Sequence, residues 1–261
     1  MAQSNSPARI AFVTGAAQGL GESIALRLAD DGLDVAINDI PSKVEQLKAV
    51  ATQIEGKGRR ALVLTGDVTR EEDVRDNVVQ VVGQLGGLDV MIANAGIGIH
   101  KSFLQTTTEE WDRIMAINLR GVMLCYRYAA LQMIKQGRGG RIIGASSQAG
   151  KKGTTNLSAY CATKFAVRGL TQSLALELAE HNITVNAYAP GFILTSLAYH
   201  PNDAVNGLRP GGTIKQLFGL PLDSPEAQPE VISSMVSYLA KPESYFITGQ
   251  TILVNGGTLF D

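Results

Sequence analysis

Short apolar runs alternate with longer amphipathic stretches along the whole chain, and this alternation limits its fold more than any other feature. The apolar runs, rich in β-branched residues and therefore expected to be strands, cover residues 9–14, 34–39, 60–67, 88–94, 140–146, 183–190 and 250–256. The stretches with helical periodicity cover residues 19–31, 42–56, 71–85, 109–137, 159–180 and 226–240. Strands that alternate with helices predict βαβ units, and continuous apolar strands predict a parallel sheet covered on both faces. We therefore expect an α/β fold, a doubly wound parallel sheet of about seven strands with helices on both faces.

One segment interrupts this alternation. Residues 191–225 are rich in Gly, Pro and Asn and begin where a predicted strand ends. Ligands of such sheets bind beyond the carboxyl ends of the strands, so the segment is interpreted as a lid or substrate loop. A surface insertion is the alternative interpretation. No linker divides the chain, and residues 1–261 are expected to form a single domain.

Composition and charge exclude several classes of protein. The formal net charge of −1 argues against a nucleic-acid partner. No apolar run approaches the ~20 residues of a transmembrane helix, and the segment MAQSNSPARI lacks the apolar core of a signal peptide. A cytoplasmic protein without a membrane partner is expected. Cys125 and Cys161 match no metal-ligand spacing, so no metal is expected and both are interpreted as buried, reduced thiols.

Glycines follow the first predicted strand and open the first predicted helix. Gly15, Gly19 and Gly21 have the spacing G-x-x-x-G-x-G. Glycine permits a tight turn and a close approach of the backbone to a pyrophosphate, and a helix N-terminus supplies free N–H groups to an anion. Because strand, glycines and helix come in the required order, the stretch predicts a dinucleotide site.

An acidic residue ends the second predicted strand. Asp39 lies 18 residues after Gly21, where a carboxylate accepts hydrogen bonds from the adenosine ribose and repels a 2′-phosphate. No arginine occurs at 16–18 or directly after Asp39, and Lys43 is the only nearby cation. These residues predict NAD(H) as the cofactor. The alternative is that Asp39 only forms a turn before Pro41.

Polar and small residues also end the third and fourth predicted strands. Asp67, followed by Val68, is a candidate acceptor for the adenine amino group. Asn94 and Gly96 would let the chain pass close to the cofactor. Taken alone, each residue is as consistent with an ordinary turn at the end of a strand.

A serine, a tyrosine and a lysine form the candidate catalytic set. Tyr160 and Lys164 lie at positions i and i+4 and share one helix face, and Ser147 follows the fifth predicted strand. A free phenol has a pKa near ~10, and a neighbouring ammonium is expected to lower it. Tyr160 would then exchange a proton with a substrate oxygen that Ser147 holds. A Tyr–Lys pair without function on the surface is the alternative.

These motifs together identify a family resemblance. The stretches TGAAQGLG, NAG, SQAG, YCATK and PGFILT stand at the intervals typical of the short-chain dehydrogenase/reductase family, over essentially the whole chain. The resemblance implies a single NAD-binding Rossmann domain. It also implies that Asn118 in INLRG holds a water that links Lys164 to solvent, and that Lys164 binds the nicotinamide ribose. Further cofactor residues implied by the motifs are Gln18, Leu20, Ala95, Pro190, Gly191, Ile193 and Thr195, the last two at the nicotinamide carboxamide.

The expected activity is NAD(H)-dependent interconversion of a secondary alcohol and a ketone, with Tyr160 as acid and base. Gln148 follows Ser147 and is a candidate donor to a second substrate oxygen. The stretches SSQAG, KFAVRGLTQSLALELA and TGQTILVNGG resemble acetoin/diacetyl reductases, also called meso-2,3-butanediol dehydrogenases. That resemblance implies a small neutral vicinal hydroxyketone or diketone as substrate. The family also suggests a homotetramer formed through residues 109–137, 159–180 and the C-terminal segment.

Other functions stay open at this stage. The loop at 196–225 departs from the acetoin reductase subgroup, as does Thr154, so a bulkier or cyclic secondary alcohol is the second candidate. A non-catalytic nucleotide sensor is disfavoured because all four catalytic residues are present. The three histidines, His100, His181 and His200, form no zinc-ligand pattern with the cysteines. His200 lies in the loop, where it either reaches substrate or stays solvated.

Overall fold

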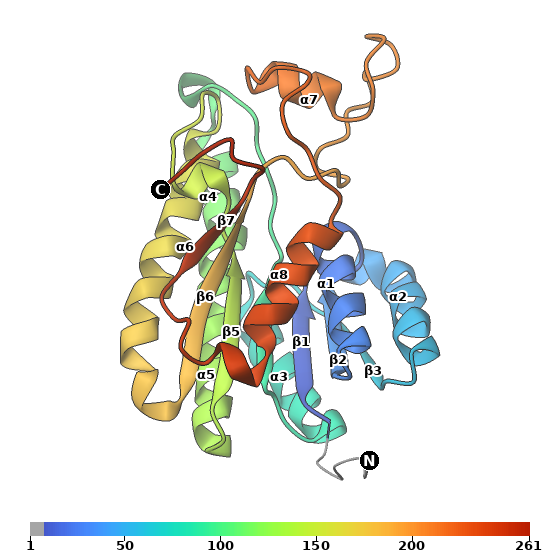
Figure 1. Ribbon diagram of the computed structural model, residues 1–261, viewed down its shortest axis with the longest axis vertical. Coiled ribbons are helices and arrows are strands. Elements are labelled where there is room, and N and C mark those ends of the chain that lie inside the picture. The colour runs from blue at the N-terminus through green and yellow to red at the C-terminus, as the bar shows by residue number, and fades with distance from the viewer. Residues whose placement is uncertain (1–7) are drawn as a thin grey trace.

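The computed structural model of the protein describes residues 8–261 and contains a parallel seven-stranded sheet (Figure 1). The strand order is β3-β2-β1-β4-β5-β6-β7, which is typical of a doubly wound sheet. Successive strands are added on one side of β1 up to β3, and from β4 onward on the other side. The strands are β1 (Ile10–Thr14), β2 (Asp34–Asp39), β3 (Ala61–Thr65), β4 (Val90–Ala93), β5 (Gly140–Ala145), β6 (Ile183–Pro190) and β7 (Thr251–Val254). The prediction about a signal peptide concerns a segment that lies largely outside the described residues.

Eight α-helices of the described chain connect and cover these strands. They are α1 (Gly19–Asp30), α2 (Val44–Gly56), α3 (Glu71–Leu85), α4 (Thr108–Met115), α5 (Gly121–Gln136), α6 (Ser158–Glu177), α7 (Gly212–Leu217) and α8 (Glu230–Ala240). Helices α3, α5 and α6 pack on one face of the sheet. Helices α1, α2 and α8 pack on the other face. The predicted fold class is therefore confirmed.

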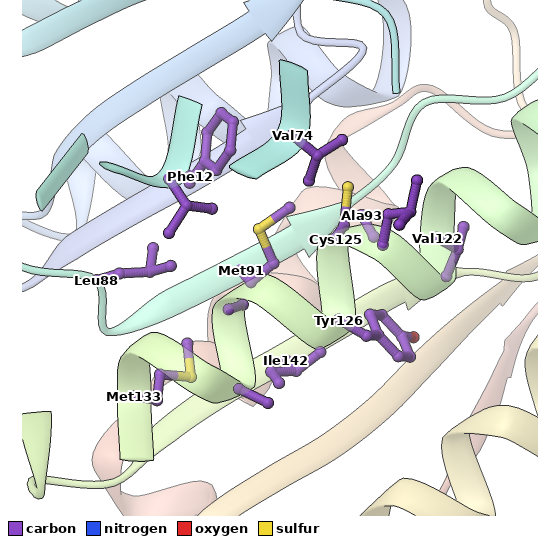
Figure 2. Packing of buried hydrophobic residues seen from close by; sticks show 14 of the residues in the cluster. Phe12, Val74, Leu88, Met91, Ala93, Val122, Cys125, Tyr126, Met133 and Ile142 are labelled. Atoms are coloured by element: carbon purple, nitrogen blue, oxygen red, sulfur yellow. The ribbon is translucent and has the colours of Figure 1, made fainter. Parts of the chain in front are cut away.

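The alternation of side chains along each strand divides the core into two layers. On the face covered by α5, Phe12 and Met91 from the strands meet Tyr126 and Met133 from the helix (Figure 2). The next residue of β1, Val13, points to the opposite layer. Burial of such apolar side chains provides the main stabilisation of the fold.

Most element boundaries agree with the sequence pattern, and the exceptions have physical reasons. Strands β2 and β6 and helix α3 have the predicted limits, whereas the runs 60–67, 88–94 and 250–256 form shorter strands. The run 88–94 ends as a strand at Ala93, and the Asn94 N–H bonds to the Thr14 hydroxyl at 3.1 Å. The helix predicted over 109–137 begins at a capping box formed by Thr107 and Glu110, and a π-helical turn, Ala116–Arg120, interrupts it. The segment 191–225 contains the short helix α7, which periodicity within a Gly-rich stretch did not reveal.

The carboxyl ends of the parallel strands lie at one edge of the sheet, the upper edge in Figure 1. Helix α7 lies beyond this edge, above the strand ends. Most residues predicted for the cofactor lie at or just after strand ends, so the fold gathers them there. Asn118 lies in the helical segment between α4 and α5, and Tyr160 and Lys164 lie in α6. Within residues 8–261, the helices are all too short or too polar to span a bilayer.

One glycine of the central sheet leaves room for the core on the α5 face. A Cβ added at Gly144 in β5 would overlap the hydroxyl of the buried Tyr126. Gly144→Ala should lower the free energy of unfolding by ~1–3 kcal/mol, the usual cost of overpacking a core. Gly83 lies on the exposed side of α3, where an added Cβ meets nothing. Gly83→Ala should therefore raise the free energy of unfolding by ~0.5–1 kcal/mol. Urea denaturation measures both, and equal stability of Gly144→Ala and the wild type would contradict the packing described.

Candidate active site

The glycine-rich turn between β1 and α1 has the geometry that its sequence predicts. Gly15 and Gly19 have left-handed φ angles of +65° and +63°. A Cβ at Gly21 would overlap the carbonyl group of Gly15, so the turn tolerates no side chain there. Gln18 at the start of α1 makes no side-chain cap, which leaves the first helical N–H groups available to an anion.

A neighbouring asparagine holds this turn in place. The Asn94 Nδ2 donates to the carbonyl oxygens of Thr14 and Gly15 at 2.9 and 3.1 Å. Its Oδ1 accepts from the Tyr188 hydroxyl at 2.8 Å. Sequence reasoning placed Asn94 near the cofactor but missed Tyr188, whose single hydroxyl within an apolar strand was the only signal.

The carboxylate of Asp39 faces the glycine-rich turn. Its Oδ2 accepts from the Ala17 backbone N–H at 3.2 Å, and its Oδ1 accepts from the Ile40 N–H at 2.9 Å. Lys43 donates to the Gln18 carboxamide oxygen at 3.3 Å and so is bonded away from Asp39. A negative charge therefore lies at the end of β2, on the rim of the turn.

The residues after β3, Asp67 and Val68, also make local contacts. The Asp67 Oδ1 accepts from the Thr69 N–H at 2.9 Å, the geometry of a turn. Val68 is buried against Gly121 at the start of α5. Leu20 packs against the core on the α1 face.

Lys164 is buried beside Tyr160. Its Nζ lies 5.4 Å from the centroid of the Tyr160 ring and donates to the Ala145 carbonyl oxygen at 2.8 Å. Burial lowers the pKa of Lys164 to about 8. Burial also raises the pKa of Tyr160, although a hydrogen bond from Ser147 acts in the opposite direction. The expectation of a lowered tyrosine pKa is therefore wrong for this structure, because the desolvation of the phenolate outweighs the groups that stabilise it.

Ser147 caps a 3₁₀ turn, Gln148–Gly150, directly after β5. Its Oγ accepts from the Ala149 N–H at 3.1 Å, which leaves the hydroxyl hydrogen free to donate. The Gln148 side chain is half-buried, and its Oε1 accepts from the Thr258 hydroxyl at 3.1 Å. The structure thus brings Ser147 and Tyr160 together and ties Gln148 to the C-terminal segment.

Asn118 lies fully buried in the π-helical turn. Its Oδ1 accepts from the Ile97 N–H and its Nδ2 donates to the Ile97 carbonyl oxygen, each at 2.8 Å. A Cβ added at Gly96 would lie 3.3 Å from the Asn118 Oδ1 and 3.7 Å from the Lys164 Nζ. The chain after β4 therefore passes close to Lys164 at Gly96. π-turns are frequent at functional sites, and this one directs Asn118 toward that chain.

The segment after β6 crosses the glycine-rich turn. The sequence-predicted residues here are Pro190, which ends β6, and Gly191, Ile193 and Thr195 in the segment itself. The Thr195 side chain lies 3.6 Å from where a Cβ on Gly19 would be. Ser196, which sequence reasoning missed, accepts a hydrogen bond from Gln18 at 2.9 Å. Ile193 is buried and pairs with Ala227 in an isolated bridge, which fixes the start and the end of the segment together.

The remaining histidines serve local structure. The His200 Nδ1 accepts from the Asn202 N–H at 3.1 Å. His181 lies in the 3₁₀ turn Ala179–His181 after α6. In the part of the chain that the structure describes, no group of His, Cys, Asp and Glu is arranged to hold a metal ion.

The buried charge of Lys164 should make stability depend on pH. An unfolded lysine has a pKa near ~10.4, whereas the folded value is about 8. Below pH 8, Lys164 is protonated in both the folded and the unfolded protein, so the full cost of burying its charge lowers the stability of the fold. Between these values the unfolded state binds more protons, so stability contributed by this site rises with pH. Lys164→Met should therefore raise the free energy of unfolding by ~2 kcal/mol at pH 7, allowing for one lost hydrogen bond.

The gain from Lys164→Met should shrink at pH 9.5, where the wild-type lysine is already neutral when folded. Urea denaturation of both proteins at the two pH values measures the difference, with exposed Lys48→Met as the matched control. A gain that is absent at pH 7, or that grows with pH, would rule out the buried charge as its cause.

Comparisons with known proteins agree with this arrangement. Residues 9–205 match the family described as short chain dehydrogenase. A short-chain dehydrogenase/reductase of Armillaria gallica is 48% identical over 98% of each chain. The L-2,3-butanediol dehydrogenase of Corynebacterium glutamicum is 39% identical over 97% of this chain and 99% of its own. A solved short chain dehydrogenase from Mycobacterium paratuberculosis, bound to NAD, has a TM-score of 0.85 and 32% identity over 96% and 97% of the two chains. The protein belongs to the short-chain dehydrogenase/reductase family and is a dehydrogenase that uses a nicotinamide cofactor.

Proposed function

We propose that the protein uses NAD(H) to interconvert a secondary alcohol and a ketone. The observation that carries this proposal is the meeting of Ser147, Tyr160 and Lys164 next to the glycine-rich turn. A proton donor, a hydrogen-bond donor and a buried cation then surround one point at the carboxyl edge of the sheet. Reduction of a carbonyl needs a proton donor at its oxygen, and a hydrogen-bond donor and a nearby positive charge stabilise the negative charge that develops there.

The residues fit a dinucleotide. The cradle of Gly15, Gly19 and Gly21 with the uncapped start of α1 suits the pyrophosphate, and Asp39 suits the adenosine ribose. Thr195, Lys164 and the chain around Asn94 and Gly96 would hold the nicotinamide half. When bound, NADH supplies the hydride.

The residues of the chain supply and steer the proton. Because burial keeps the pKa of Tyr160 high, the phenol is protonated at neutral pH and can give its proton to the carbonyl oxygen. Ser147 donates a hydrogen bond to the same oxygen. Lys164, with a pKa of about 8, can restore the proton of Tyr160, and Asn118 positions the chain that covers this lysine.

Asp39 should determine the choice between the two nicotinamide cofactors. Its carboxylate would repel a 2′-phosphate, so we expect NADH to exceed NADPH in kcat/KM by tenfold or more, which is ~1.4 kcal/mol. Asp39→Ala should narrow this ratio, whereas Asp30→Ala, a loss of the same charge at the far end of α1, should leave it unchanged. Steady-state kinetics with both cofactors measure the ratio, and a wild type that uses NADPH equally well would contradict the assignment.

The substrate that we favour is a small vicinal hydroxyketone or diketone. The similarity to an L-2,3-butanediol dehydrogenase supports a substrate with two adjacent oxygens. Because Thr258 holds the Gln148 carbonyl oxygen, the amide NH₂ of Gln148 is the end left to meet the second oxygen, and it has no partner among residues 8–261.

A bulkier or cyclic ketone is the second candidate, and one observation favours it. The buried residues Ala149, Leu157 and Cys161 form an apolar cluster with Tyr160 and Phe218. This surface beside the reacting phenol offers nothing to a second hydroxyl and suits a hydrocarbon ring.

Two variants test the reaction and the substrate together. Tyr160→Phe should lower turnover of every ketone by ~10²-fold or more while NADH still binds, because the ring remains and only the proton is lost. Gln148→Ala should lower kcat/KM for diacetyl and acetoin by ~10- to 100-fold, the effect of one unpaired polar group, and spare butan-2-one. Tyr245→Phe, an exposed position, is the control. Near-normal turnover by Tyr160→Phe would refute the mechanism, and an equal loss on all three ketones would refute the role of Gln148.

A cytoplasmic homotetramer is the proposed form of the protein. Large apolar side chains are exposed on α5, on α6 and near the C-terminus, namely Leu131, Phe165, Leu176, Phe246 and Phe260. Such patches are typical of subunit contacts. Both cysteines, Cys125 and Cys161, are free and buried, which suits a reducing compartment. Sedimentation velocity would test the assembly, and a monomer would contradict it.

A further inference from the structure

The lid, residues 191–225, has internal bonds of its own. The buried carboxylate of Asp203 accepts from the N–H groups of Gly211 and Thr213 at 2.9 and 2.8 Å, at the start of α7. The buried Lys215 contacts Glu226 at 2.6 Å, where the chain leaves the lid. These bonds give the lid a defined shape, so a contact at one point of it positions the whole segment.

The loop after β4 is a fixed base opposite the lid. Asn118 holds both backbone groups of Ile97, as described above. At the other end of the loop, the Lys101 N–H donates to the Asn156 carbonyl oxygen at 2.8 Å. His100 lies between these two anchored positions.

His100 joins this base to the lid. Its Nε2 lies 3.1 Å from the carbonyl oxygen of Leu217, the last residue of α7. Because a carbonyl oxygen only accepts, the Nε2 must carry the hydrogen. The imidazole also packs against Phe218, with ring centroids 5.3 Å apart and an angle of 36° between the planes.

Phe218 continues the contact toward the catalytic residues. It packs against the apolar cluster of Ala149, Leu157 and Cys161, which also includes Tyr160. The ring of Phe218 therefore lies between His100 on one side and the start of α6 on the other. Phe218 is the lid residue of that cluster, so the lid reaches the surroundings of Tyr160 through this ring.

We propose that His100 and Phe218 are a positioning pair that latches the lid over Tyr160. On the proposed function, with the bulkier ketone as substrate, the Phe218 ring is also the wall that contacts an apolar ring or chain beside the reacting carbonyl. A neutral cyclic ketone fills the space that Phe218 borders, whereas a four-carbon ketone leaves the wall without contact. Loss of the latch uncovers the cluster and lowers the affinity for the cyclic substrate.

Alkylation of the two native cysteines tests the latch without any activity measurement. Cys161 belongs to the cluster under Phe218, whereas Cys125 lies in the deep core beside α5 and reports global unfolding. Iodoacetamide labelling followed by peptide mapping gives both rates in the same sample. His100→Ala and Phe218→Ala should raise the labelling rate of Cys161 by ~5- to 10-fold and leave that of Cys125 unchanged.

The chemistry of His100 offers a conservative variant. A glutamine amide nitrogen occupies nearly the place of the histidine Nε2, so His100→Gln keeps the donor to Leu217 and should raise Cys161 labelling by no more than ~3-fold. His181→Ala, a loss of imidazole in the turn after α6, should match the wild type. Unchanged Cys161 labelling in His100→Ala overturns the latch, and so does a parallel rise at Cys125, which would show a role in the whole fold.

Kinetics with two simple ketones test the wall. Phe218→Ala should raise KM for cyclohexanone by ~10-fold and for butan-2-one by no more than ~2-fold, with NADH binding unchanged. An equal rise for both ketones overturns the assignment of Phe218 as the wall. If the wild type reduces neither ketone, the bulkier ketone has failed as a substrate and the wall that rests on it is overturned too, while the cysteine labelling still decides the latch.

Discussion

The carboxamide of Asn94 joins three strands at the edge of the sheet where the reaction is expected to occur. From the end of β4 it donates to the backbone at the end of β1, at Thr14 and Gly15, and it accepts from Tyr188 in β6. All its bonds are made to groups at or near the carboxyl ends of strands, which the parallel sheet aligns along one edge. Together with the bond from the Ala17 N–H to Asp39, these bonds hold the glycine-rich turn in place. A half-buried carboxamide with its bonds satisfied fixes a geometry that apolar packing alone leaves loose.

Polar side chains also fix the geometry around the candidate catalytic residues, and here burial of a charged group costs stability. Lys164 is buried and its charged form is disfavoured, as the lowered pKa shows. The chain accepts this cost because the same burial places the ammonium next to Tyr160. Asn118 in its π-turn fixes the chain that covers the lysine by holding Ile97 at both backbone groups. Polar residues that reduce stability at a site are expected where their chemistry is needed.

The lid differs from the rest of the site because it is positioned by few contacts. It meets the glycine-rich turn through Ser196 and the loop after β4 through His100. Each of these two contacts contains one hydrogen bond of modest net free energy, ~1 kcal/mol, and Phe218 adds apolar packing beside His100. We propose that this segment opens and closes without disturbing the sheet, as substrate entry and product release require.

The sequence by itself determined the sheet, its two covered faces and the gathering of the motifs at one edge. Those features depend on local patterns: the alternation of apolar residues, the spacing of Gly15, Gly19 and Gly21, and the four-residue interval between Tyr160 and Lys164. The tertiary structure decided what depends on contacts between distant segments. The raised pKa of Tyr160 comes from burial by several elements at once, and no residue near it in the chain announces it. The bond from His100 to Leu217 joins segments far apart in the sequence and has no local pattern. The π-turn places the Asn118 carboxamide where it bonds both backbone groups of Ile97 in the loop after β4, and helical periodicity carries no information about that partner.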